Sequence, residues 1–155
     1  MKYQSTLIAV RDMECSKQFY CELLGLKVTD DFGANVTLSG YISLQTLDTW
    51  QSFLHKQTSE IILGNNAGEL YFEEDDMDGF LEKLAAMPDI EYVHPPMEHS
   101  WGQRVVRFYD PDRHIIEVGE NIVIVVHRFL ESGLTVEETA ARMDVPQEYV
   151  RRCLA

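Results

Sequence analysis

The feature that most constrains the fold is an internal repeat, because one order of predicted elements occurs twice along the chain. A strand at residues 3–10 precedes a helix that Asp12 caps, and three short strands follow. A strand at residues 69–73 likewise precedes a helix capped by Asp75 or Asp76, again with three strands after it. In both helices the core-facing side chains recur at i, i+3, i+4 and i+7. The sequence therefore predicts two tandem β-α-β-β-β modules.

The repeat also predicts the domain organisation. One domain covers residues 1–120, as module one at 1–47, a connector at 48–67 and module two at 68–120, and residues 121–155 form a helical C-terminal extension. The predicted three-strand sets are residues 26–32, 34–38 and 41–47, and then residues 90–94, 103–109 and 114–118. A four-stranded sheet of this size needs a partner layer to bury one face. We expect an α+β fold in which two curved sheets form a barrel or cleft that holds the ligand site.

Composition excludes several classes of partner. At 155 residues and 45% hydrophobic content, one domain can bury its core without disulfides. The formal net charge of −13 disfavours nucleic acids and anionic membranes and would attract a cationic guest. Three cysteines without Cys-x-x-Cys spacing indicate neither a disulfide framework nor a structural zinc site. With no signal-like or membrane-length apolar run, we expect a cytoplasmic protein with no membrane insertion.

The last predicted hairpin places a carboxylate where an apolar side chain is usual. Asp110-Pro111-Asp112 is strong turn chemistry, and the following Ile115-Ile116-Glu117-Val118 has the β-branched character of a buried strand. A buried carboxylate is unfavourable without a partner. Glu117 is therefore expected to face a cation, a metal ion or a group of hydrogen-bond donors.

This hairpin resembles that of the vicinal oxygen chelate superfamily, which includes glyoxalases, bleomycin-resistance proteins and extradiol dioxygenases. Its usual turn is Asp-Pro-Asp-Gly, and the Glu beyond it is typically a metal ligand, a role that falls here on Glu117. The resemblance covers roughly residues 1 to 120 and implies the same two-module architecture. Arg113 stands where the family has Gly. A left-handed backbone there would cost a non-Gly residue about 1 kcal/mol, so we expect a somewhat different local turn.

The resemblance further implies metal ligands on the first, fourth, fifth and eighth strands. The matching positions are Ser5, either Ser43 or Gln45, Glu69 and Glu117. Only the two carboxylates are strong ligands, so such a site suits Mg²⁺ or Mn²⁺ better than Zn²⁺ or Ni²⁺. His99 is a further candidate metal ligand, although a loop histidine facing solvent is the alternative. The other alternative is that Arg107 pairs with both carboxylates.

Strand parity places Gln103, Val105 and Arg107 on one face of the seventh strand. If that face lines the cleft, Arg107 can bind a ligand carboxylate or phosphonate in bidentate fashion, and the alternative is an ion pair with Glu117. The predicted ligand-binding residues are Ser5, Trp101, Gln103 and Arg107.

Residues 121–155 lie outside the repeat. Residues 122–130 fit either a ninth strand or a helix. Thr135 and Glu138 form a capping box, and Val145-Pro146 starts a second helix, which is similar to the helix-turn-helix of small DNA-binding domains. Residues 120–155 contain six acidic residues against four arginines. We therefore expect the extension to pack on the barrel end or on a dimer partner rather than to bind DNA.

Two functional classes stay open. The resemblance implies a homodimer that binds a small oxygen-rich molecule, and in an enzyme a metal-assisted lyase, isomerase or dioxygenase in which Glu117 is the catalytic residue. Ser5 and Glu69 replace two family histidines, which disfavours glyoxalase I and extradiol dioxygenase chemistry. The alternative is a non-catalytic drug-binding or metabolite-binding protein like those of the bleomycin-resistance branch. A ligand-responsive regulator that uses the extension to bind DNA is the weakest of the three hypotheses.

Overall fold

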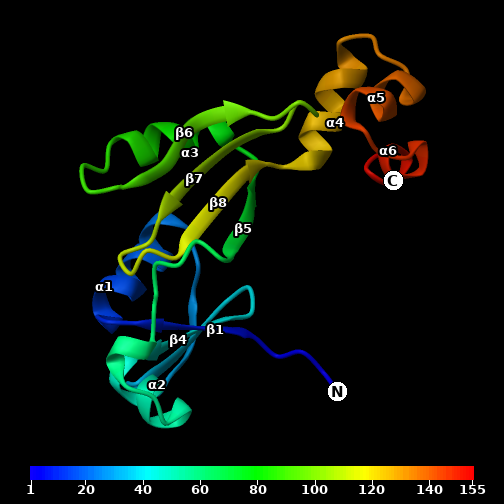
Figure 1. The fold of residues 1–155 in the computed structure, drawn as a ribbon. Helices are drawn as coiled ribbons and strands as arrows, with labels where there is room; N and C mark the ends of the chain where they lie inside the picture. The colour runs from blue at the N-terminus through cyan, green and yellow to red at the C-terminus, as the bar shows by residue number, and fades with distance from the viewer. The chain divides into compact units, whose positions relative to one another are not determined.

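The computed structural model describes all residues, 1–155, as two compact units (Figure 1). The first unit contains Met1–Gly68 together with Asp110–His114, and the second contains Glu69–Tyr109 together with Ile115–Ala155. Each unit holds one four-stranded mixed sheet, so the α+β class and the two tandem modules are confirmed. No helix has both the length and the apolar character needed to cross a bilayer.

The first unit follows the predicted β-α-β-β-β order. Its sheet has the order β1-β4-β3-β2, with β1 parallel to β4 and the other neighbours antiparallel. Asp12 caps the first helix by accepting a hydrogen bond from the backbone N–H of Cys15. The elements of this unit are β1 (Thr6–Val10), α1 (Met13–Gln18), the π-helix η1 (Phe19–Leu23), β2 (Val28–Asp31), β3 (Asn35–Leu38), β4 (Ile42–Thr46), α2 (Leu47–Leu54) and the 3₁₀ helix η2 (Thr58–Glu60).

The second unit repeats this topology with the sheet order β5-β8-β7-β6. β5 runs parallel to β8, and β7 is antiparallel to both β8 and β6. Asp76 caps α3, so of the two predicted candidates, Asp75 and Asp76, the second is the cap. The elements are β5 (Glu69–Glu74), α3 (Met77–Ala85), β6 (Tyr92–Glu98), β7 (Arg104–Tyr109), β8 (Ile115–Glu120), α4 (Ile122–Glu131), α5 (Val136–Met143) and α6 (Gln147–Arg152).

The turn between β7 and β8 places Arg113 in the left-handed backbone region. Arg113 has a φ of 70°, which is the left-handed region that usually favours glycine. The Asp110 carboxylate accepts hydrogen bonds from the backbone N–H groups of Asp112 and His114 at 2.9 and 2.8 Å. The Tyr20 hydroxyl donates to the same carboxylate at 2.8 Å within the first unit. These bonds hold the turn with Arg113 in the left-handed region, and the expectation that the turn differs locally from that of the family stays a prediction.

The C-terminal extension consists of three helices joined by short turns, which decides the ambiguity at residues 122–130 in favour of α4. Asn121 caps α4, and Thr135 and Glu138 form the predicted capping box of α5. The helices share a small apolar core of their own. Its buried residues are Val125, Val126, Ala140, Met143 and Val150, with Phe129, Val136 and Val145 packed against them. The apolar residues of the extension therefore serve first to hold its own helices together.

Candidate functional site

One face of the second sheet is lined with polar and aromatic side chains. Tyr71 of β5 and Arg107 of β7 both pair in register with Glu117 of the central strand β8. Side chains two residues apart on a strand share a face, so this face also carries Glu69 and Glu73 of β5. The opposite face is apolar at its centre, where Phe108 contacts Phe80 of α3 with ring centroids 6.3 Å apart, and it carries Arg104 and Glu120 at one end. We call the first of these the polar face.

At the centre of the polar face, Arg107 binds two carboxylates. Its Nε donates to Glu69 at 2.8 Å, and one of its terminal nitrogens donates to Glu117. The other terminal nitrogen lies 3.3 Å from Nε2 of His94 on β6. The Glu117 side chain is only 8% exposed, against 23% for Arg107 and 35% for Glu69. We call Glu69, Arg107 and Glu117 the Glu-Arg-Glu cluster.

The two carboxylates of the cluster have opposite pKa shifts. Burial raises the pKa of Glu117 to about 7, and the hydrogen bond and negative charge of Glu69 act in the same direction, against the attraction of Arg107. The hydrogen bond from Arg107 lowers the pKa of the more exposed Glu69. Near neutral pH, Glu117 therefore exists in both protonation states, whereas Glu69 stays ionised. The cluster can accept or donate one proton.

The residues present do not fit a resident divalent metal. The superfamily typically binds one, but here both strong donors, Glu69 and Glu117, are bound to the guanidinium of Arg107, whose charge would repel a dication. In the first unit, Ser43 donates to Ser5 at 3.1 Å, so those predicted positions offer only neutral hydroxyls. No group of three or more His, Cys, Asp or Glu side chains lies close enough together to hold a metal ion.

His99 lies against an aromatic ring. Its imidazole stacks on Trp101 with the ring centroids 4.0 Å apart. Burial, together with the positive charge of Arg107, lowers its pKa, so the ring is neutral at physiological pH. A metal-binding role for His99 stays a prediction, and it would require donors beyond those that the described residues place around it.

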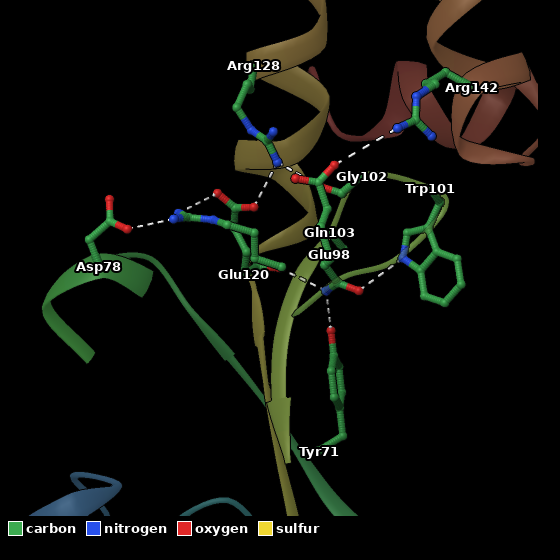
Figure 2. A network of polar contacts seen from close by, with 10 residues as sticks. Tyr71, Asp78, Glu98, Trp101, Gly102, Gln103, Glu120, Arg128 and Arg142 are labelled. Atoms are coloured by element: carbon green, nitrogen blue, oxygen red, sulfur yellow. Dashed lines mark hydrogen bonds and ion pairs between the residues drawn. The ribbon is translucent and has the colours of Figure 1, made fainter. Parts of the chain in front are cut away.

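A buried glutamine organises the aromatic end of the polar face (Figure 2). The Gln103 amide donates to the Tyr71 hydroxyl and to the backbone carbonyl of Glu120, both at 2.9 Å. Its carbonyl accepts from the Trp101 indole at 3.1 Å, and Tyr71 in turn donates to Glu73 at 2.9 Å. Burial raises the pKa of Tyr71 to about 12, so its hydroxyl keeps its proton. Gln103 thus fixes two aromatic side chains, and its predicted contact with a ligand stays a prediction.

The structure brings the predicted residues Glu69, Arg107 and Glu117 into contact and places Trp101 and Gln103 at the end of the same face. Arg107 meets two carboxylates of its own sheet, so the prediction that it binds an anionic ligand group stays a prediction.

Sequence reasoning missed the part of the site that the extension contributes. Tyr71, Glu73 and Trp101 line a cavity of about 430 Å³ together with Asp144 and Tyr149 from the extension. Strand parity could have found the two β5 residues, because they alternate with Glu69. No local pattern predicts the position of Asp144 or Tyr149, since it depends on how α5 and α6 pack.

The comparisons with known proteins identify the class. A glyoxalase-like domain matches residues 3–123, and the chain therefore belongs to the glyoxalase-like domain family of the vicinal oxygen chelate superfamily. Among curated proteins, none matches this chain. The match ends two residues into α4, so almost all of the helical extension lies beyond the family domain.

Several solved structures are similar to this chain. A protein of unknown function from Agrobacterium tumefaciens str. C58 is 38% identical, with a TM-score of 0.70, and the match covers 78% of this chain and 94% of that one. A glyoxalase-related enzyme from Fulvimarina pelagi is 19% identical, with a TM-score of 0.63 over 79% and 91% of the two chains. A lactoylglutathione lyase from Agrobacterium tumefaciens is 23% identical, with a TM-score of 0.56 over 79% and 95%. The last two show the fold alone.

Proposed function

We propose that this protein binds a small molecule on the polar face of its second sheet without a resident metal, and that Glu117 forms the central polar contact to the ligand. The observation that carries the proposal is the Glu-Arg-Glu cluster. It holds a nearly buried carboxyl group, together with an ion pair, at the middle of a face that is lined by aromatic side chains. Binding sites of this kind combine apolar walls with a few fixed polar groups.

The donor set favours binding over metal-assisted catalysis. Glu69 and Glu117 are the only strong ligands at the positions that the resemblance implies, and Arg107 binds both. The second hypothesis from the sequence, a non-catalytic metabolite-binding or drug-binding protein, is therefore the first proposal here. The homodimer expected from the resemblance stays a prediction that light scattering can check.

Metal content and ligand binding test this proposal. Wild-type protein and the Glu117→Gln variant are incubated with Mg²⁺, Mn²⁺, Zn²⁺ and Ni²⁺, desalted and subjected to elemental analysis, with the exposed Glu131→Gln as the control. We expect well below one metal ion per chain in all three proteins. Near-stoichiometric metal in wild type and in the control, lost only in Glu117→Gln, would contradict the proposal.

The binding arm uses thermal shift with a panel of small organic cations, carboxylates and neutral polyols. We expect at least one class to raise the Tm of wild type and of Glu131→Gln, and to raise that of Glu117→Gln less. Equal shifts in all three proteins would show that Glu117 does not contact the ligand.

The pKa of Glu117 favours a second candidate, a metal-free proton-transfer enzyme of the isomerase or lyase class. A carboxyl group with a pKa of about 7 can act as both base and acid near neutral pH. In such a reaction the Glu117 carboxylate removes a proton from carbon next to a ligand carbonyl, and the protonated carboxyl group returns it to the product.

Deuterium exchange tests this second candidate. Hydroxyacetone and related hydroxyketones are incubated with the protein in D₂O, and the loss of the C–H signal next to the carbonyl is followed by NMR. Exchange with wild type that is absent with Glu117→Gln would establish the activity. Equal exchange with both proteins would rule out Glu117 as the base.

A further inference from the structure

The helical extension forms one wall of the cavity at the end of the polar face. Tyr71 and Trp101 contribute the sheet side, and Met143, Asp144 and Tyr149 contribute the helical side. At about 430 Å³ the cavity is large enough for a metabolite-sized molecule. Every lining residue belongs to the second unit, so the cavity is complete within that unit.

The extension is anchored firmly enough to serve as a wall (Figure 2). Arg128 of α4 donates to the Gly102 carbonyl at 2.7 Å and to Glu120 at 2.9 Å, and Glu120 also accepts from Arg104 at 3.0 Å. The Glu120 side chain is only 4% exposed, whereas those of Arg104 and Arg128 are 33% and 41% exposed, so the shared carboxylate is buried and its partners are partly open to water. The Phe129 ring packs directly on Gly102, where a Cβ atom would lie 2.2 Å from the ring. The wall is therefore preformed.

Three aromatic residues, Tyr71, Trp101 and Tyr149, line this cavity, and each is held by other contacts. The Gln103 amide binds the Trp101 indole and the Tyr71 hydroxyl. The Arg152 guanidinium lies over the ring of Tyr149, 5.4 Å from its centroid. The faces of such rings carry partial negative charge and attract cations.

The charged residues that line the cavity are both acidic. Glu73 is fixed by the Tyr71 hydroxyl at 2.9 Å, and Asp144 ends α5 in a left-handed conformation with a φ of 55°. No Lys, Arg or His lines the cavity. A guest with positive charge and an apolar body therefore matches the aromatic rings, the two carboxylates and the side chain of Met143 at once.

We infer that the cavity between the polar face and the helical extension binds an organic cation, an amine or quaternary ammonium group joined to an apolar body. The inference rests on the proposed function in placing the ligand on the polar face, and it adds the charge class of the ligand and the role of the extension. The three rings surround the cationic group, Glu73 and Asp144 supply its counter-charge, and the apolar body lies against Met143.

Isothermal titration calorimetry with defined probes tests the inference. Choline and benzyltrimethylammonium are the cations, and 3,3-dimethylbutan-1-ol is the uncharged isostere of choline. We expect the wild-type protein to bind choline about tenfold more tightly than the isostere, because only the cation gains from the rings and carboxylates. Equal affinity for choline and its isostere, or no binding of either cation, would overturn the inference.

Matched variants locate the site. Tyr149→Leu removes an aromatic ring and should weaken cation binding roughly fivefold, whereas Tyr149→Phe keeps the ring and should bind within about twofold of wild type. Asp144→Asn removes a charge and should also weaken binding roughly fivefold, while asparagine tolerates the left-handed backbone. Circular dichroism confirms that each variant is folded. Cation binding unchanged in both Tyr149→Leu and Asp144→Asn would overturn the inference.

The proposed function can fail separately. If Glu117→Gln abolishes the binding of a carboxylate or polyol while the cations bind nowhere, the polar face binds small molecules but the inferred ligand class is wrong. If the cations bind and only the cavity variants, not Glu117→Gln, weaken their binding, the inference holds and the central contact assigned to Glu117 is wrong.

Discussion

Glu117 is expected to titrate near pH 7, well above an ordinary glutamate. Its pKa rises from 4.5 to about 7 because burial and the neighbouring Glu69 both disfavour its charged form. At about 1.4 kcal/mol for each pKa unit, this difference corresponds to about 3 kcal/mol. The folded protein holds the Glu117 proton more tightly than the unfolded chain does. The stabilisation from this proton is therefore complete below pH 4.5 and is lost as the pH rises through about 7.

The direct assay is NMR of protein labelled with ¹³C at the glutamate carboxyl carbons, titrated from pH 4 to pH 9. The Glu117 signal is assigned as the one missing from Glu117→Gln. We expect its inflection near pH 7 in wild type and at lower pH in Glu69→Gln, because that variant removes the repulsive charge and leaves Arg107 to Glu117.

Unfolding in urea gives an independent measure. Between pH 5 and pH 8 the free energy of unfolding of wild type should fall relative to that of Glu117→Gln, by an amount on the order of 3 kcal/mol. An inflection between pH 4 and pH 5, or parallel pH dependence in the two proteins, would refute the reasoning about burial.

Three further predictions concern the anchoring of the extension. Gly102→Ala should lower the free energy of unfolding by about 3 kcal/mol, because the new Cβ meets the Phe129 ring at a φ of 88°. Gly133 has a φ of 99° but open space around it, so Gly133→Ala should lower the free energy of unfolding by only about 1 kcal/mol. Urea unfolding compares the two glycine variants. Glu120→Ala should lower the free energy of unfolding by about 2 kcal/mol, because Arg104 and Arg128 lose the carboxylate that they share and keep only Asp78 and the Gly102 carbonyl. Faster hydrogen exchange in α4 is the readout. Thr135→Ala removes the capping box and should lower the free energy of unfolding by about 1 kcal/mol, which is followed as a decrease in Tm.

Much of the fold could be predicted because it depends on short-range patterns. Alternating and β-branched segments gave all eight strands, and the side-chain chemistry of Asp12 and Thr135 gave two of the helix starts. The boundaries of β6 were predicted less well. The prediction ended this strand at His94, but β6 continues to Glu98. Pro95 and Pro96 fit within it because β6 is an edge strand, where a missing N–H is tolerated.

The candidate site was predictable where strand parity controls it. Strand parity and the hairpin pattern are enough to place Arg107 beside Glu117. In the structure these two residues are direct partners in the register of β7 and β8. The choice between a metal site and an ion pair depends on side-chain conformations across three strands, which no pattern in the sequence encodes. The left-handed backbone of Arg113 could not be predicted from the sequence either. It depends on the hydrogen bonds of Asp110 and on the close packing of Gly64 against Arg113, which are tertiary contacts.

The position of α5 and α6 beside the cavity has a consequence for the dynamics of the chain. Any opening motion that separates these helices from the sheet destroys the cavity, so a bound molecule must oppose that motion. At one hundred times its dissociation constant, a ligand would make such opening about a hundredfold rarer. The backbone amides of the two helices would then exchange with solvent correspondingly more slowly, and the extension would report on the occupancy of the site.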